Sequence, residues 1–175
     1  MSHRIVLSGA DIDRAIKRIS HEILESNEGS DNLVILGIPT RGLHLARRIS
    51  EFLSTIDSSY VPLVGSLDIT MYRDDFAEVT KTIGKTEIPG NDLTGKVVCL
   101  VDDVLFTGRT IRAALDAIND FGRPEQVKLA VLVDRGHREL PIRPDFVGKN
   151  LPTSRSERVT VQLSEVDDSD QVVIG

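Results

Sequence analysis

The stretch at residues 97–115, VVCLVDDVLFTGRTIRAAL, constrains the fold of this chain more than any other part of the sequence. Its first five residues, 97–101, are apolar with no polar alternation, which is typical of a strand buried on both faces in a parallel sheet. Asp102 and Asp103 follow at once, where we expect the strand to end. A loop of small residues and an amphipathic segment come next. The order strand, acidic pair, loop and helix predicts an α/β fold.

The loop after the acidic pair has the composition of a phosphate-binding loop. Backbone N–H groups at a helix N-terminus form a pocket for anions, and the helix dipole adds partial positive charge. The hydroxyls of Thr107 and Thr110 can donate to phosphate oxygens, and Gly108 lacks the Cβ that would keep a phosphate from the backbone. Asp102 and Asp103 can accept hydrogen bonds from vicinal ribose hydroxyls or lie near Mg²⁺. For the acidic pair alone, a helix N-cap with a solvated neighbour is the alternative.

The whole stretch closely resembles the phosphoribosyl-pyrophosphate (PRPP) signature of type I phosphoribosyltransferases. The signature has branched apolar residues, two acids and a loop that contains Thr-Gly, all of which stand in register here. The stretch is not a Walker A loop, because no Gly-Lys-Ser/Thr follows four variable residues, and it lacks the Rossmann pattern G-x-G-x-x-G.

Length and composition predict one soluble domain over residues 1–175. The net charge of −6 gives no global electrostatic case for nucleic-acid binding, so any such function needs a local basic patch. The single cysteine, Cys99, excludes a disulfide within the chain and is expected to be a buried, inert thiol. No apolar run is long enough to span a membrane, and the N-terminus lacks the pattern of a signal peptide. We therefore expect a cytoplasmic protein with no membrane partner.

A second strand is expected at residues 33–38, after a helix at residues 9–26 with apolar residues at helical spacing. The loop Pro39-Thr40-Arg41-Gly42 and a helix from about 43 to 53 follow. Because open α/β sheets bind ligands at the carboxyl ends of their strands, Arg41 and nearby N–H groups could hold a diphosphate. The alternative is an ordinary turn with a surface arginine.

Residues 61–70 are expected to form a strand, and about 71–91 a long polar loop. A loop of this length in a compact domain is commonly a flexible lid. PRPP reacts through a charge-separated transition state from which water must be excluded, so a lid would be useful here. Arg73 is a candidate to reach the pyrophosphate when such a lid closes. The alternative is a mobile hairpin that never contacts the reacting groups.

The segment at residues 134–158 is locally basic, and we expect a strand on either side of it, at 127–133 and 159–163. From 135 to 158, Lys and Arg outnumber acids by six to three, although the chain as a whole is acidic. The first helix adds a basic outer face. A phosphate-rich partner would need such a patch. Surface arginines paired with acids are the alternative, and charge alone does not separate the two. The acidic residues 165–170 are expected to be exposed.

Taken together, these stretches resemble the PyrR family of bifunctional pyrimidine-operon regulators with uracil phosphoribosyltransferase activity. The resemblance runs over nearly the whole chain, and its motifs are GIPTRG (37–42), LDITMYRDD (67–75), VDDVLFTGRT (101–110), AVLVDRGHRELPIR (130–143) and VGKNLPTSRSE (147–157). It implies a type I phosphoribosyltransferase fold, in which a mostly parallel sheet is flanked by helices and a small hood at about 134–158 covers the base. It also implies the reaction uracil + PRPP → UMP + pyrophosphate, with Mg²⁺ on the diphosphate.

The resemblance assigns site residues by their matching positions. Thr40 and Arg41 fall in the pyrophosphate loop, and Asp102 and Asp103 take the ribose hydroxyls, directly or through Mg²⁺. The loop for the 5′-phosphate comprises Val104, Leu105, Phe106, Thr107, Gly108, Arg109 and Thr110. Arg135 and Val159 lie where the hood meets the uracil, mostly through backbone groups. The catalytic set is then Asp102, Asp103, Arg41 and Arg73.

The resemblance also implies binding to a stem-loop in the leader of the pyrimidine (pyr) operon mRNA, promoted by UMP or UTP. The matching basic positions are Arg18, His21, His137, Arg138, Arg143 and Lys149. Two positions depart from the family pattern: Phe106 stands where Tyr is more frequent, and Lys17 where relatives often have a small hydroxyl residue. Purine-specific relatives carry a carboxylate at position 106, so its absence fits a pyrimidine acceptor and leaves no named general base.

Two other functions remain open on the sequence. One is a uracil-salvage phosphoribosyltransferase without an RNA-binding role, and the other is an RNA-binding regulator whose transferase activity is vestigial. The intact acidic pair and phosphate loop argue against the second. A single RNA-binding face requires that Arg18 and Arg138 do not point to opposite surfaces. The family further implies a homodimer or larger homo-oligomer.

Overall fold

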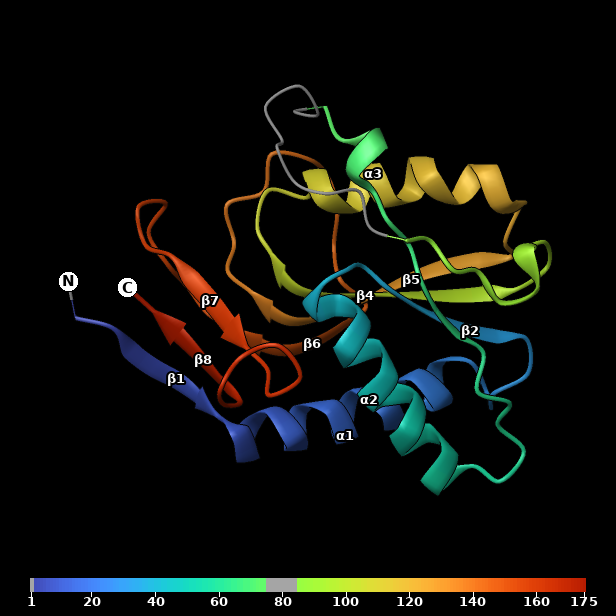
Figure 1. The fold of residues 1–175 in the computed structure, drawn as a ribbon, viewed down its shortest axis with the longest axis horizontal. Helices are drawn as coiled ribbons and strands as arrows, with labels where there is room; N and C mark the ends of the chain where they lie inside the picture. The colour runs from blue at the N-terminus through green and yellow to red at the C-terminus, as the bar shows by residue number, and fades with distance from the viewer. Residues whose placement is uncertain (1, 75–84) are drawn as a thin grey trace.

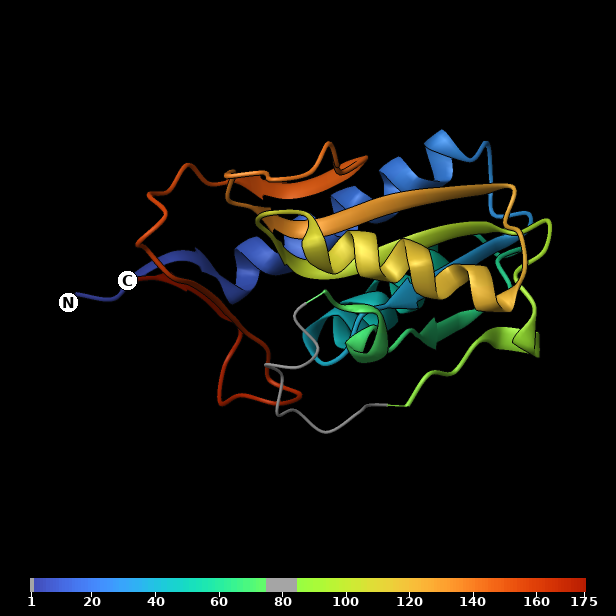
Figure 2. The same ribbon diagram turned by 90° about the horizontal axis from the view of Figure 1, so that it is seen from above.

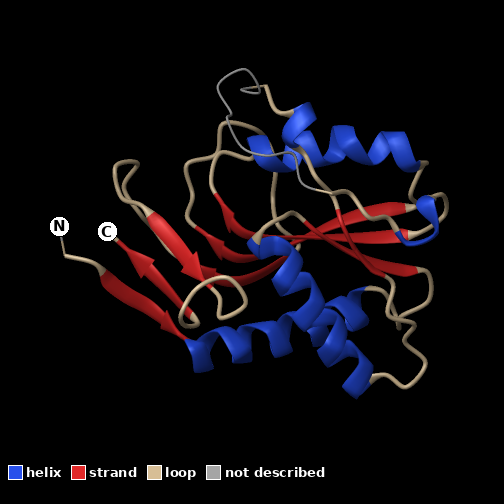
Figure 3. Ribbon diagram, in the orientation of Figure 1, coloured by secondary structure: helices blue, strands red, loops and turns tan. Residues whose placement is uncertain are grey.

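The computed structural model describes residues 2–74 and 85–175. A larger parallel sheet stands next to a smaller antiparallel sheet in Figure 1, and Figure 3 separates the helices from the strands by colour. The strands are β1 (Arg4–Ser8), β2 (Leu33–Gly37), β3 (Val64–Ser66), β4 (Val97–Leu105), β5 (Gln126–Asp134), β6 (Phe146–Asn150), β7 (Val159–Gln162) and β8 (Gln171–Ile174). The helices are α1 (Gly9–Ser26), α2 (Arg41–Ile56) and α3 (Arg109–Ile118), with 3₁₀ turns at Thr70–Tyr72, Pro89–Asn91 and Asn119–Phe121.

The larger sheet is parallel, with the strand order β3-β2-β4-β5-β6. Helices α1 and α2 cover one face and α3 covers the other (Figures 1 and 2). Alternate residues of β4 serve the two faces: Cys99 and Val101 join the core under α1 and α2, whereas Val98 and Leu100 join the core under α3. A strand in this position must be apolar on both sides, which explains the continuous run in the sequence. The predicted α/β class is confirmed.

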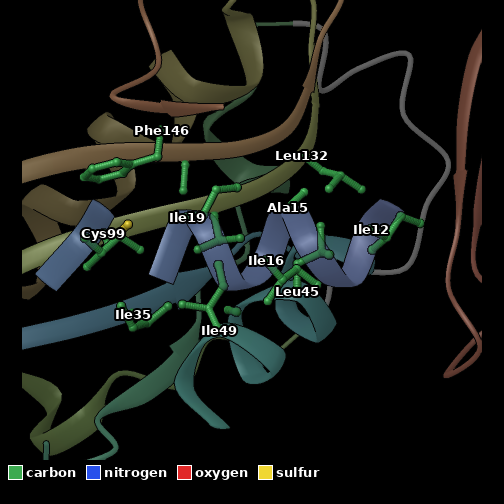
Figure 4. Close-up of a cluster of buried hydrophobic side chains, with 14 of the residues drawn as sticks. Ile12, Ala15, Ile16, Ile19, Ile35, Leu45, Ile49, Cys99, Leu132 and Phe146 are labelled. Carbon is green, nitrogen blue, oxygen red and sulfur yellow. The ribbon is translucent and has the colours of Figure 1, made fainter. Parts of the chain in front are cut away.

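The core on the α1 side is formed by two amphipathic helices, α1 and α2, packed against the sheet. In Figure 4, Ile12, Ile16 and Ile19 of α1 face Leu45 and Ile49 of α2. All five side chains are at most 5% exposed. Helix α1 has the predicted bounds, and its start is fixed by a capping box between Ser8 and Asp11.

The smaller sheet has the order β1-β8-β7, and all of its pairs are antiparallel. From here on, the name hood refers to this sheet and the loop between β7 and β8, which are other residues than the segment at about 134–158 to which the sequence assigned this name. Its central strand, β8, pairs Arg4 with Ile174 on one side and Val159 with Ile174 on the other. The two ends of the chain therefore lie close together, as Figure 1 shows. Apolar side chains of β7 and β8 belong to the same core as α1, so the hood packs directly on the larger sheet's helices.

Three predicted boundaries were wrong. Strand β4 does not end at Asp102 but runs through the acidic pair to Leu105, because its pairing with β5 continues as far as Asp134. Strand β3 covers only 64–66 of the predicted 61–70, since the chain then turns into the 3₁₀ segment, where the Asp68 carboxylate accepts the Thr70 N–H. Helix α2 begins at Arg41 rather than near 43.

Within residues 2–74 and 85–175, none of the helices combines the length and the apolar character that crossing a membrane requires.

Candidate active site

A cavity of about 410 Å³ opens at the carboxyl ends of the parallel strands. Its walls come from the end of β4, the loop into α3 and the start of the predicted lid. The lining residues are Arg73, Asp74, Asp102, Val104, Leu105, Phe106, Thr107, Gly108, Arg109, Thr110 and Ile111. This is the edge at which open α/β sheets hold ligands. The structure thus brings the predicted phosphate loop, one of the two aspartates and the predicted lid arginine around one space.

The two aspartates lie side by side on β4, and their burial differs. Asp102 is only 7% exposed, and its carboxylate accepts the backbone N–H of Asp103 at 2.9 Å. Asp103 is half-buried and accepts the N–H of Val104 at 2.7 Å. Burial, and then the neighbouring charge of Asp103, hold the pKa of Asp102 well above its ordinary value. A carboxylate kept in this position gains most from a ligand that donates hydrogen bonds or positive charge.

The phosphate loop ends on a glycine that caps α3. Gly108 has φ = +94°, a backbone conformation that L side chains rarely adopt. The hydroxyl of Thr107 accepts the N–H of Arg109 at 3.3 Å, which tightens the turn into the helix. The first turn of α3 contains no acidic residue, so an anion at this end meets the helix dipole without repulsion from the helix itself.

The junction of β2 and α2 is packed so closely that the glycines on either side of the loop, Gly37 at the end of β2 and Gly42 in the first turn of α2, have no room for a side chain. A Cβ on Gly37 would collide with the backbone of α2, and one on Gly42 would come within 2.6 Å of the Val101 carbonyl oxygen of β4. The peptide bond between Pro39 and Thr40 is cis. These contacts bring the first turn of α2 against the end of β4, next to the acidic pair.

Arg41 has a partner that the sequence did not suggest. Its Nη2 and Nε donate at 2.8 and 3.2 Å to the carboxylate of Asp167, which lies in the loop between β7 and β8. This pairing, together with the N–H of Leu163, lowers the pKa of Asp167. The expectation that residues 165–170 are exposed holds for 165, 166, 168 and 169, whereas Asp167 and Asp170 are half-buried. Glu165 and Asp170 pair with Arg48. Only tertiary structure could reveal the contact, since its partners are 126 positions apart.

Arg73 and Asp74 connect the start of the predicted lid to α3. Arg73 Nη1 lies 3.5 Å from the hydroxyl of Thr110, and Asp74 accepts a hydrogen bond from Arg109 at 2.7 Å. Residues 75–84 of the predicted lid at about 71–91 lie outside the described residues. Arg109 also binds Glu139 at 3.0 Å, so it joins the lid's first residues to the basic segment after β5.

The predicted base-binding residues lie apart from the cavity lining. Arg135 is 7% exposed, with its guanidinium 4.0 Å from the centre of the Phe106 ring and its Nη2 donating to the Ser154 carbonyl at 2.9 Å. Its Nε is buried and has no hydrogen-bond partner among the described residues. Burial lowers the pKa of Arg135. Val159 is half-buried at the start of β7 in the hood. Phe106 therefore connects the phosphate loop to this side of the site.

The six predicted RNA-binding residues divide into two groups. Arg18, His21, Arg143 and Lys149 are exposed, and Arg18 Nη2 donates to two β6 carbonyls, of Val147 and Gly148, at 2.7 and 2.6 Å. His137 and Arg138 turn inward instead. The His137 ring meets the Phe106 ring edge-on at 5.9 Å and contacts the Thr153 carbonyl, and Arg138 binds three protein oxygens.

Arg18 and Lys149 of the exposed group lie on the β6 side of the sheet, whereas His21 packs against Phe52 of α2. Arg18 reaches the backbone of β6, the strand that carries Lys149, and β6 is the neighbour of β5, whose last residue, Asp134, binds Arg138. Arg18 and Arg138 thus approach two adjacent strands. An aromatic ring also lies within the basic face of α1, because Phe52 of α2 packs against His21 and lies 5.9 Å from Lys17 Nζ. The linear sequence, in which Phe52 is far from these residues, gave no signal of this.

The chain matches known proteins over its whole length. The phosphoribosyl transferase domain model matches residues 5–165. Among solved structures, a hypoxanthine-guanine phosphoribosyltransferase from Bacillus anthracis superposes with a TM-score of 0.72 at 16% identity, covering 100% of this chain and 99% of that one. A hypoxanthine phosphoribosyltransferase from Staphylococcus aureus gives 0.69 at 17% identity, covering 97% and 90%. At such identities the likeness shows a shared fold and nothing more.

Curated relatives are much more similar in sequence. A bifunctional protein PyrR from Leifsonia xyli subsp. xyli is 62% identical, over 99% of this chain and 97% of its own length. Another from Streptomyces coelicolor is 61% identical, over 98% and 89%. A third, from Thermus thermophilus, is 57% identical, over 95% and 92%. The chain therefore belongs to the family of bifunctional PyrR proteins and carries a phosphoribosyl transferase domain.

Proposed function

We propose that the chain transfers the ribosyl phosphate of PRPP to uracil, and that it regulates pyrimidine synthesis by binding pyr operon mRNA in response to uridine nucleotides. The observation that carries the proposal is a cavity lined by both the buried Asp102 and the phosphate loop, in which Gly108 caps α3. The chain is also 62% identical to a bifunctional relative. The same identity disfavours the alternative of a salvage enzyme without a regulatory role.

In this reaction the C1–O bond to pyrophosphate breaks and a bond from C1 to uracil N1 forms, with loss of the N1 proton. The loop from Val104 to Thr110 holds the 5′-phosphate, and Asp102 and Asp103 accept hydrogen bonds from the ribose hydroxyls. In this proposal the charge of the leaving pyrophosphate is stabilised by Arg73, which lines the cavity, and by Arg41, which lies outside the lining and is bound to Asp167. Catalysis then comes mainly from positioning and from fixed charges at the leaving group.

Mg²⁺ fits the site as a partner of the substrate rather than as a resident of a protein cage. Among the described residues, no three His, Cys, Asp or Glu side chains cluster in a way that could hold a metal ion. Mg²⁺ is commonly bound by one or two carboxylates plus substrate phosphates, and Asp102 and Asp103 supply such oxygens. When bound, the ion would neutralise charge on the diphosphate.

The RNA-binding part of the proposal is supported by exposed basic side chains, two of which, Arg18 and Lys149, lie on the β6 side. Arg18, His21, Arg143 and Lys149 offer positive charge on an otherwise acidic protein. Contacts of this kind neutralise backbone phosphates and make affinity depend on salt. We also expect the protein to act in the cytoplasm as a homodimer or larger homo-oligomer, which size-exclusion chromatography with light scattering can measure.

The first prediction concerns RNA binding. The protein should bind its own pyr leader RNA more tightly with UMP than without it, and it should also form UMP from uracil and PRPP. Arg143→Gln should weaken RNA binding at every UMP concentration and reduce the slope of log affinity against log salt by about 1, because one phosphate contact is lost. Gel shifts across a salt series and a radiolabelled uracil assay measure these quantities.

Arg123→Gln is the matched control, because Arg123 is an exposed arginine beyond the C-terminus of α3, the end opposite the phosphate loop. It should leave the affinity and its salt slope unchanged. RNA binding that ignores both UMP and RNA sequence, with full transferase activity, would instead identify a salvage enzyme with a basic surface.

A further inference from the structure

The phosphate loop is held from outside by the segment that follows β5. Thr107, in the middle of the loop, accepts the N–H groups of Glu139 and Leu140 with its carbonyl at 2.9 and 3.2 Å. Near the start of the loop, the Leu105 carbonyl accepts the N–H of Arg135 at 3.1 Å. The loop therefore cannot shift without moving residues 135–140.

Arg138 is the side chain that completes this attachment. Its Nη1 donates to the Phe106 carbonyl at 2.9 Å, its Nε to the Ile142 carbonyl at 2.8 Å and its Nη2 to the Asp134 carboxylate at 2.6 Å. Every nitrogen of the guanidinium thus has a protein acceptor, and the side chain is only 23% exposed. Three of its five N–H groups are bound within the protein, so an RNA phosphate would find at most the remaining two.

The three acceptors belong to three functionally different places. Phe106 is in the phosphate loop, Asp134 is the end of β5, and Ile142 immediately precedes Arg143, which is exposed. A Cβ added at Gly108 would lie 3.4–3.5 Å from the side chains of Ile142 and Leu140, in ordinary van der Waals contact. A single arginine thus joins the backbone that receives the 5′-phosphate to the backbone that presents a cation to RNA.

We propose that Arg138 is a positioning residue that fixes the phosphate loop and links its occupancy to the orientation of Arg143, rather than a residue that contacts RNA. The link to RNA rests on the proposed function, but the effect on nucleotide binding does not. Without the guanidinium, the Phe106 carbonyl and the Asp134 carboxylate lose charge-assisted hydrogen bonds, and the loop is no longer held in one geometry. A lysine cannot replace it, because a point charge does not span three acceptors in a plane.

The second prediction tests this positioning role with Arg138→Gln and Arg138→Lys. Both variants should bind UMP at least fivefold more weakly and show a raised KM for PRPP, while the KM for uracil stays within about twofold. Without nucleotide, their affinity for leader RNA should equal that of the wild type within about twofold. At UMP concentrations that saturate each variant, the strengthening of RNA binding should be reduced or lost.

Calorimetric titration with UMP, initial-rate kinetics and gel shifts give these values, and melting curves verify that both variants fold. Arg123→Gln serves again as the control, with wild-type values expected throughout. If Arg138→Lys binds UMP normally, or if Arg138→Gln loses RNA affinity equally with and without UMP, the positioning role is wrong and Arg138 contacts RNA directly. Failure of the wild type to bind RNA would refute the regulatory function alone, since the UMP titration does not involve RNA.

Discussion

At the scale of single residues, the site depends on a carboxyl group placed where water cannot fully solvate it. Asp102 is nearly as buried as the valines before it, because β4 continues to pair with β5 beyond the acidic pair. The position that we propose for contact with the ribose hydroxyls therefore also makes the ionised form of this group costly. Activity and stability should oppose each other at this position.

The third prediction is that Asp102→Asn stabilises the folded protein while it removes activity. The pKa of Asp102 is raised above its ordinary 3.8, so its ionisation costs more in the folded than in the unfolded chain. Its contribution to stability is greatest below pH 3.8 and declines as the pH rises through the folded pKa. The asparagine variant should therefore melt above the wild type at neutral pH, and the two should converge towards pH 4.

Loss of a charged hydrogen-bond acceptor for the ribose should reduce kcat/KM roughly ten- to a hundredfold, which corresponds to about 1.5–3 kcal/mol. Thermal melts from pH 4 to 8 and initial rates measure both effects. Asp116→Asn, on the exposed face of α3, is the control and should alter neither. Melting curves that differ by the same amount at every pH would contradict the argument.

At the scale of elements, helix α2 and the loop between β7 and β8 are joined by two arginines. Arg41 and Arg48 are seven positions apart and so lie on one side of α2. Arg41 binds Asp167, and Arg48 binds Glu165 at 2.6 Å and Asp170 at 2.8 Å. The helix that begins at the pyrophosphate loop is thereby attached to the hood. These contacts hold Arg41 against the loop between β7 and β8.

The fourth prediction is that Asp170→Asn destabilises the protein only where the carboxylate is ionised. The hydrogen bond from Arg48 lowers the pKa of Asp170 from 3.8 to about 2. Its stabilising effect is therefore present above pH 3.8 and disappears as the pH falls through about 2. We expect a loss of about 1 kcal/mol at pH 7, since partly exposed ion pairs contribute little, and a melting point lower by about 2–4 °C.

Melting curves measured from pH 2 to 7 test this, with the exposed neighbour Asp168→Asn as the control. A deficit that persisted undiminished at pH 2 would show that packing, and not the ion pair, is what the variant loses.

At the scale of the whole molecule, local pattern predicted the larger sheet much better than the hood. β2, β4 and β5 are buried on both faces, so their apolar runs are visible in the sequence alone. β1, β6 and β8 were not predicted, because they are short and their pairing partners are distant in the chain. The same holds for the site. The acidic pair and the phosphate loop are contiguous and were found as a motif.

Contacts between distant positions were what the sequence could not supply. Arg138 reaches Phe106 over 32 positions, and Arg41 reaches Asp167 over 126. The family resemblance placed Arg138 with the RNA-binding residues. Its side chain is directed inward by acceptors that only the folded backbone brings together.

The hood sheet has a further consequence for local opening of the folded protein. β8 lies between β1 and β7, so the sheet closes only when Arg4 meets Ile174 across almost the full chain. Joining segments so far apart carries the largest entropy of loop closure in the fold. The hood should therefore be the last unit to form during folding and the first to open in native fluctuations.

The fifth prediction follows from this order of events. In hydrogen–deuterium exchange, amides of β1 and β8 should exchange faster than those of β4 and β5, and saturating UMP should slow the hood selectively. Uniform protection of both sheets would contradict it. Nucleotide affinity would then include the free energy of holding the two ends of the chain together, so substitutions at the termini should weaken binding without touching the ligand.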